Sequence, residues 1–91
     1  MIRSFRHRGL ARYFNDADPS GVAADLADRI RRRLLTPQTA IRPQDLDLPG
    51  FDFHPLKGKP KRYSVHVNGP WCITFEWVDG DAVRVDLENY H

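Results

Sequence analysis

The sequence contains very little cysteine and no long apolar run, and these absences exclude several classes of protein. Cys72 is the single cysteine among 91 residues, so one chain can form neither an internal disulfide nor a cysteine-based zinc site. No apolar run approaches the roughly 20 residues of a membrane-spanning helix, and the basic start lacks the hydrophobic core of a signal peptide. We therefore predict a cytoplasmic protein that is neither exported nor inserted in a membrane.

Length and composition predict one domain over residues 1–91. The chain is 41% hydrophobic and 29% charged, which supplies enough apolar mass for a packed core and too much for a disordered chain. A chain of this length has no room for a second core, and it contains no internal repeat.

The net charge of +2 conceals two regions of opposite sign. Residues 1–67 hold 13 of the 14 Lys and Arg residues against 7 acids, whereas residues 68–91 hold 1 against 5. Three basic clusters, within residues 3–12, 29–33 and 57–62, could each contact phosphate. The second is more simply explained as a solvated helix face, because aspartates stand four residues before two of its arginines. The third has no such partners.

Apolar periodicity predicts two helices in the first half of the chain. Residues 10–14 carry one apolar stripe and predict a short helix that ends at the turn sequence NDADP. From about Ser20 to Leu35 an apolar residue recurs at every fourth position, which predicts a longer helix capped by Asp18 or Ser20.

Two other segments of the first half are expected to be less regular. Ile2 to Phe5 alternates weakly and predicts a short first strand. Residues 36–50 contain three prolines and no sustained period, so we expect an ordered surface connection held down by Leu46 and Leu48.

From residue 51 onward, apolar and polar residues alternate. The segments 63–67, 71–77 and 83–87 predict three half-buried strands. The sequences Asn-Gly-Pro and Asp-Gly-Asp between them are hairpin signals, which makes the strands an antiparallel meander. The apolar sides share one face only if the loops have three residues or contain a bulge.

The register that keeps the apolar residues on one face defines specific pairs. It places Trp77 opposite Val83, Phe75 opposite Val85, Glu76 opposite Arg84, and His66 opposite Cys72. A slip by two residues would instead place Ser64 opposite Cys72.

The predicted fold class is α+β: a small antiparallel β-sheet with two N-terminal helices packed on one face. The other face should be an open platform of polar side chains. Its expected members are Ser64, His66, Cys72, Thr74, Glu76, Arg84, Asp86 and Glu88.

Histidines are the first candidates for chemistry, because imidazole exchanges protons near neutral pH. His54 lies just before the third basic cluster, close in sequence to Lys57. It is equally well explained as a strand-end histidine that donates to a backbone carbonyl. His91 follows Tyr90 at the end of the chain, where an exposed tail is the simpler explanation.

Other chemistries find little support in the sequence. The histidines are scattered without metal-ligand spacing, so we expect no metal and no cofactor. A nucleophilic pair of Cys72 and His66 would lack an orienting group, which favours an inert thiol. Trp71 and Trp77 alternate with core residues, which favours core packing over base stacking.

Several short motifs become specific when they occur together. They are IRSFRHRGL at the start, DLDLPGF, HPLKG at 54–58, VNGPWCITFEW followed by DGDA, and ENYH at the end. In this order and spacing, over essentially the whole chain, the sequence resembles the HigB toxins of the RelE-like superfamily of bacterial toxin-antitoxin systems, also called plasmid maintenance killer proteins.

The resemblance implies a metal-independent endonuclease that cleaves messenger RNA in the ribosomal decoding site. It also implies a HigA-like helix-turn-helix antitoxin as partner, with DNA contacted only through that antitoxin. In such a reaction the ribose 2′-hydroxyl attacks the adjacent phosphate, which requires a base, an acid and cations.

The resemblance also implies roles for individual residues. His54 and His91 correspond to proton-transfer groups, Lys57 to phosphate stabilisation, and Tyr90 to RNA positioning. Auxiliary RNA contacts are expected from Lys59, Lys61, Arg62, His66, Cys72 and, unless Glu76 occupies it, Arg84.

Three positions depart from the family pattern. Cys72 stands where these toxins usually carry an active-site arginine, His66 where arginine is frequent, and Asn89 where aspartate is usual. A thiol lacks the charge and bidentate geometry of arginine, so we expect cleavage to be weakened about a hundred- to thousandfold. The change Cys72→Arg should then raise cleavage and toxicity. The sequence does not separate natural divergence at Cys72 from a deliberate attenuating change.

Two alternatives to an active enzyme stay open. The first is a toxin-like binding module that has lost catalysis and represses its operon in complex with the antitoxin. The second is a free-standing RNA-binding domain, which predicts salt-sensitive binding to naked RNA.

Overall fold

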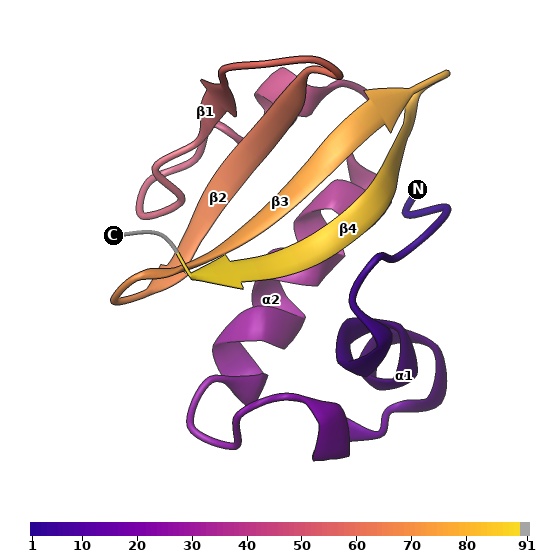
Figure 1. Ribbon diagram of the computed structural model, residues 1–91, viewed down its shortest axis with the longest axis vertical. Helices are drawn as coiled ribbons and strands as arrows, with labels where there is room; N and C mark the ends of the chain where they lie inside the picture. Colours follow the sequence, from indigo (N-terminus) through magenta and orange to yellow (C-terminus); the bar gives the residue numbers. More distant parts are fainter. Residues whose placement is uncertain (90–91) are drawn as a thin grey trace.

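In the computed structural model, which describes residues 1–89, a four-stranded antiparallel sheet lies over two α-helices (Figure 1). The helices are α1 (Arg8–Asp16) and α2 (Ala27–Thr39), and the 3₁₀ turns are η1 (Pro19–Gly21) and η2 (Pro43–Leu46). The strands are β1 (His54–Leu56), β2 (Arg62–Asn68), β3 (Trp71–Val78) and β4 (Asp81–Asn89), in the spatial order β1-β2-β3-β4. The predicted α+β class is confirmed.

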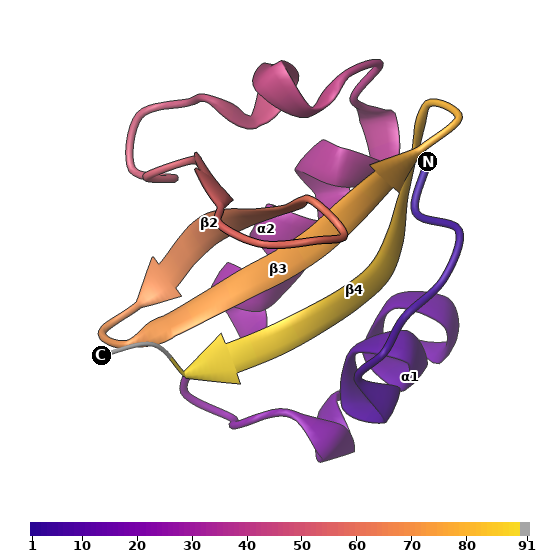
Figure 2. The same cartoon turned by 45° about the horizontal axis from the view of Figure 1, so that its top comes forward.

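The core lies between α2 and one face of the sheet, here called the covered face. Figures 1 and 2 show α2 crossing behind the strands, with α1 packed beside it near β4. The largest buried side chains come from both layers: Leu10, Ile30 and Leu34 from the helices, and Val65, Val67, Ile73, Phe75 and Val85 from the strands. Trp71 and Trp77 pack against this cluster, so their expected role in the core is confirmed.

The second helix begins seven residues later than predicted, at Ala27 rather than Ser20. The cause is a close approach between Gly9 and Gly21, where a Cβ on Gly9 would lie 2.2 Å from the Gly21 carbonyl oxygen. Only glycine permits this contact, which holds η1 against α1. Asp18 therefore caps η1, accepting from the Ser20 N–H at 3.0 Å.

The same helix also ends later than predicted. It continues through Pro37, whose ring is buried, and the Ala40 N–H closes the last turn on the Thr36 carbonyl at 3.0 Å. Burial of the ring offsets the hydrogen bond that proline cannot donate. In the following connection Leu46 is fully buried, as predicted, whereas Leu48 is 43% exposed, so its predicted anchoring role is wrong.

The sheet contains one strand more than predicted, because β1 pairs with β2 over three residues. The segment from Ile2 to Phe5 forms isolated parallel bridges to Ala82 and Val85 rather than a regular strand. It runs along the outer edge of β4, as Figure 2 shows.

The predicted register holds between β2 and β3 at His66, and between β3 and β4 it holds from Trp71 to Thr74 but fails at Glu76 and Trp77. His66 lies opposite Cys72 as preferred, but Trp77 pairs with Ala82 and Glu76 with Val83. A two-residue turn joins β3 to β4, and the register shift follows later, beside Arg84, whose φ is 52°. The predicted pairs Trp77–Val83 and Glu76–Arg84 are therefore wrong, whereas Phe75 and Val85 lie at the register shift itself. The bulge that the alternation requires lies within the strand rather than in the loop.

None of the helices described over residues 1–89 is long and apolar enough to cross a bilayer.

Candidate functional site

The sheet face opposite α2, called the polar face below, brings His54 into a row with three other polar residues. Register places His54 opposite Ser64, Ser64 opposite Thr74, and Thr74 opposite Asp86. Directly opposed residues point to the same side of a sheet, so these four side chains cross all four strands on one face.

A second row lies next to the first, toward the end of β4. It contains His66, Cys72 and Glu88, which oppose one another on β2, β3 and β4. The last described residue, Asn89, pairs with Trp71 beside this row. The predicted platform therefore exists, and it lies where β4 ends.

His54 is exposed and held in one tautomer. Its Nδ1 lies 2.8 Å from the carbonyl oxygen of Asp52. A carbonyl only accepts hydrogen bonds, so Nδ1 carries the proton and, in the neutral ring, Nε2 carries a free lone pair. The contact is the strand-end hydrogen bond that the sequence suggested, and it leaves Nε2 able to accept a proton.

The backbone just before His54 is held against β2 at two points. Phe53 stacks on Tyr63 with ring centroids 5.5 Å apart, and the Phe51 carbonyl accepts from the His66 N–H at 2.6 Å. Asp52 between them has a φ of 46°, a left-handed conformation that aspartate tolerates better than most residues.

Arg33 of α2 connects this segment to the helix. Its Nε donates to the His66 carbonyl at 2.9 Å, its Nη2 to the Gly50 carbonyl at 3.4 Å, and its guanidinium lies 4.2 Å from the Phe51 ring centroid. Burial, followed by the charges of Arg29 and Arg32, lowers the pKa of Arg33 from its usual value. The prediction that the second basic cluster is a solvated face is therefore wrong for Arg33.

The third basic cluster divides into free and paired residues. Lys57 and Lys59 are exposed and make no ion pair or hydrogen bond within the described part of the chain. Lys61 is also exposed, with Nζ 5.5 Å from the Tyr63 ring centroid. The segment 57–61, here called the basic loop, lies between β1 and β2 and directly follows the strand of His54.

Both arginines expected as auxiliary contacts are paired with glutamates. Arg62 Nη1 lies 3.1 Å from Glu88 Oε1, and Arg84 Nε lies 3.0 Å from Glu76 Oε2. The first pair joins β2 to β4 and therefore passes over β3. The second shows that Arg84 is paired with Glu76, as the sequence suggested.

The polar face is less open at its centre than the sequence predicted. Ser64 and Thr74 are each 1% exposed, and their hydroxyl oxygens make no hydrogen bond to any of residues 1–89. The expectation of a uniformly exposed platform is wrong for these two residues.

Other predicted site residues have mixed positions. His66 Nε2 lies 3.0 Å from the Gly69 carbonyl oxygen, to which it donates, and Cys72 is a half-buried free thiol. Tyr90 and His91 lie outside the described residues. Within residues 1–89, no three His, Cys, Asp or Glu side chains lie close enough together to hold a metal ion.

Two parts of the site had no signal in the sequence. Arg33 is separated by more than 15 residues from the carbonyls that it contacts, and no local pattern links them. The Ser64–Thr74 pair follows from strand register, but nothing in the alternation of the sequence distinguishes these two buried hydroxyls from the other polar residues of the same face.

Comparison with known proteins shows the family of this chain. Residues 3–91 match the family described as RelE-like toxin of type II toxin-antitoxin system HigB. The chain is also 41% identical over 92 residues to the curated protein Endoribonuclease HigB of Proteus vulgaris, with 100% of each chain covered. Matches that extend over nearly the whole chain show that it belongs to the HigB-like family of RelE-like toxins from type II toxin-antitoxin systems.

Proposed function

We propose that this toxin is an endoribonuclease that cleaves messenger RNA on the ribosome, with the polar face as its active site. Membership of a toxin family and 41% identity to a protein named Endoribonuclease HigB support the reaction class. The observation that carries the assignment is His54, exposed and with Nδ1 bound to the Asp52 carbonyl at 2.8 Å.

In the proposed reaction His54 is the general base. Its Nε2 accepts the proton of a ribose 2′-hydroxyl, while the hydrogen bond from Nδ1 holds the ring and favours the positive charge that develops. The 2′-oxygen forms a bond to the adjacent phosphorus, and the bond from phosphorus to the 5′-oxygen of the next nucleotide breaks. His91 donates the proton that this 5′-oxygen needs, so the products are a 2′,3′-cyclic phosphate and a 5′-hydroxyl.

The basic loop supplies positive charge beside this base. Lys57 is three residues from His54, is exposed and makes no ion pair within residues 1–89, so its ammonium is available to the charge that develops on the phosphate. Lys59 and Lys61 bind neighbouring phosphates, and Tyr90 positions the nucleotide.

The weaker RNA contacts come from the centre and the far side of the polar face. We place Arg62, His66, Cys72 and Arg84 there. Because both arginines are paired with glutamates, RNA phosphates must compete with these carboxylates. This competition, together with the uncharged Cys72, supports an enzyme that is slower than one with arginine at position 72.

The family implies an antitoxin partner, and we propose that it is a HigA-like helix-turn-helix protein through which the complex contacts DNA. Cleavage on the ribosome would place the toxin in the cytoplasm.

The alternative is a toxin-like module that has lost catalysis and acts only in its antitoxin complex. The pairing of Arg62 and Arg84 favours this alternative, because it reduces the free positive charge on the polar face.

Mapping the 5′ ends of transcripts after induction in cells separates these possibilities. We expect new ends at a fixed reading-frame position, and a decrease of about 10²- to 10⁴-fold for His54→Gln. His7→Asn is the matched control, because it removes a different imidazole while keeping an acceptor for the Leu10 N–H at the start of α1. Absence of new ends with the unmodified chain would instead support the binding module. Equal cleavage by His54→Gln would refute the assignment of the base.

A further inference from the structure

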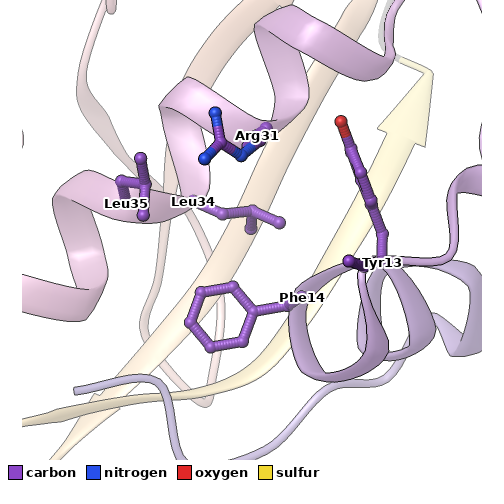
Figure 3. A pocket seen from close by; sticks show the side chains of 6 residues that line it. Tyr13, Phe14, Arg31, Leu34 and Leu35 are labelled. Carbon is purple, nitrogen blue, oxygen red and sulfur yellow. The ribbon is translucent and has the colours of Figure 1, made fainter.

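His54 lies on an open surface, where the walls of a pocket do not hold its imidazole. The groove between α1 and α2, about 350 Å³ in volume, is lined by residues of those helices and of the C-cap of α1 (Figure 3), and none of its lining residues comes from β1 or from the segment before it. The His54 ring makes one hydrogen bond within residues 1–89, from Nδ1 to the Asp52 carbonyl. The orientation of the ring therefore depends on the direction of that carbonyl.

Asp52 lies between two aromatic residues that are fixed in position. Phe51 is buried, and its carbonyl accepts from the His66 N–H at 2.6 Å. Phe53 stacks on Tyr63 with ring centroids 5.5 Å apart. Because both neighbours are fixed, the backbone angles of Asp52 determine where its carbonyl points. Its φ is 46°, and a negative φ would turn the carbonyl away from the ring unless one of the aromatic residues moved.

The backbone, rather than the carboxylate, explains why aspartate occupies this position. The Asp52 carboxylate is exposed and makes no hydrogen bond or ion pair within residues 1–89. Aspartate and asparagine enter the left-handed region more readily than most other residues that carry a side chain. The left-handed conformation itself therefore gives this residue its role.

Other left-handed residues in the described part of the chain serve the regular elements. Ala17 ends α1, Asp79 lies in the turn between β3 and β4, and Arg84 lies at the register shift of β4. Asp52 ends no helix and joins no hairpin, but it is two residues from His54. Strained backbone conformations of this kind are concentrated at functional sites.

We propose that Asp52 is a positioning residue for the base: its left-handed backbone aims its carbonyl at His54 Nδ1 and so keeps the lone pair on Nε2. The inference rests on the proposed role of His54. A neutral imidazole carries its proton on one nitrogen, so a ring without this carbonyl would partly hold the proton on Nε2, where it cannot accept another. The ring would also turn about its side-chain bonds, and a misplacement of about 1 Å costs about 10²-fold in rate.

Substitutions of Asp52 separate the backbone from the carboxylate. Asp52→Gly and Asp52→Val both remove the carboxylate, but glycine enters the left-handed region freely and a β-branched residue is an outlier there. Asp52→Asn keeps the preference of aspartate. We expect the Gly and Asn variants to cleave ribosome-bound RNA within about threefold of the unmodified chain. Asp52→Val should cleave about 10- to 100-fold more slowly.

Asp79→Val is the matched control, because it introduces the same side chain at another left-handed aspartate, with a φ of 51°. It should destabilise the fold to a similar degree and leave cleavage per folded molecule unchanged. Circular dichroism selects a temperature at which all variants are folded. Asp52→Ala and Asp79→Ala, which impose less strain, replace the valine pair if Asp52→Val does not fold.

The ¹⁵N chemical shifts of the His54 ring report its tautomer without RNA or ribosomes, at an alkaline pH where imidazole is neutral. The unmodified chain, Asp52→Gly and Asp79→Val should show a protonated Nδ1 and an unprotonated Nε2. Asp52→Val should show values averaged between the two tautomers, and this shift together with slower cleavage supports the proposal.

An unchanged tautomer in folded Asp52→Val overturns the proposal, whatever its cleavage rate. An equal loss of cleavage for Asp52→Gly and Asp52→Val also overturns it, because it would assign the role to the carboxylate. If the unmodified chain does not cleave RNA, the proposed function fails, and the chemical shifts still decide whether Asp52 sets the tautomer of His54.

Discussion

Polar side chains on the two faces of the sheet differ in how completely they are hydrogen-bonded or paired. On the covered side, Arg33 of α2 reaches two backbone carbonyls and an aromatic ring, and the surrounding side chains are apolar and buried. On the polar face, within residues 1–89, the hydroxyls of Ser64 and Thr74 are buried without a hydrogen bond, and Lys57 of the basic loop is unpaired.

The difference indicates that one face contributes mainly to stability and the other mainly to contacts with other molecules. Buried polar groups without partners reduce stability, and unpaired exposed charges contribute little to it. The covered face therefore supplies most of the stability, while the polar face retains groups that are suited to contacts outside the fold. Substitutions on the two faces should accordingly change different measurements.

Among the substitutions that compare the two faces, the largest effect is expected on the polar face, for Lys57→Met. Because the ammonium has no partner within the described chain, its loss should leave the free energy of unfolding unchanged. The ammonium is proposed to stabilise the negative charge that develops on the phosphate, so its removal should lower the cleavage rate about 10²- to 10³-fold. Rates on ribosome-bound RNA, measured in a Cys72→Arg background for sensitivity, check this expectation.

Arg32→Met is the control for Lys57→Met, since it removes a cation from the helical side. A similar loss of cleavage for both variants would show that total charge, rather than the position of Lys57, determines the rate.

Arg33→Ala should have the reverse effect and destabilise the protein. It removes charged hydrogen bonds to two carbonyls and a contact with Phe51, which together correspond to about 2–3 kcal/mol. Urea unfolding measures the change, and Arg31→Ala on the same helix should cost less than about 0.5 kcal/mol. Equal values for the two variants would contradict the connecting role of Arg33.

Thr74→Val should stabilise the protein by about 1 kcal/mol, because it replaces a buried hydroxyl, which has no partner among residues 1–89, by a methyl group of similar size. The same unfolding experiment measures it. A loss of stability would mean that the Thr74 hydroxyl is hydrogen-bonded in solution and that the two faces differ less than described.

The smallest effect concerns pH and the helical side. Hydrogen bonds from the N–H groups of Ile41 and Arg42 lower the pKa of Asp45 from its usual value. Its ionised form thus stabilises η2 above the pKa of the unfolded chain, and this contribution disappears as the pH falls through the lower folded pKa.

Melting temperatures of the wild type and of Asp45→Asn should therefore differ slightly at neutral pH and converge in acid. Asp47→Asn, at an exposed carboxylate with no hydrogen bond among the described residues, is the control. A difference that grows on acidification would reverse the sign and contradict the assignment.

Much of the fold could be predicted because its signals are local. The period of α2 and the alternation of β2, β3 and β4 are visible within ten residues of sequence, and so is the parity that places His66 opposite Cys72. The start of α2 could not be predicted, because it depends on Gly21 meeting Gly9. β1 is only three residues long and contains Pro55, so it is too short to show the alternation of apolar and polar residues that predicts a strand.

The residue types of the candidate site could be predicted from the sequence, but the hydrogen bonds that hold these residues could not. A histidine before a run of lysines is visible in the sequence, whereas the carbonyl that fixes its tautomer depends on the conformation of Asp52. Sequence also suggests only the helical partners of an arginine, four residues away. Arg32 has such a partner, and Arg33 uses carbonyls that only the tertiary fold brings near.

The outer edges of the sheet have a consequence for self-association. Residues 1–6 cover the edge of β4 with backbone hydrogen bonds, and the opposite edge strand is short and interrupted by Pro55, which has no N–H to offer. Strand-to-strand polymerisation, a common route to aggregates, therefore finds little free backbone here. The sheet is therefore closed to extension by a strand of a second molecule at both of its edges.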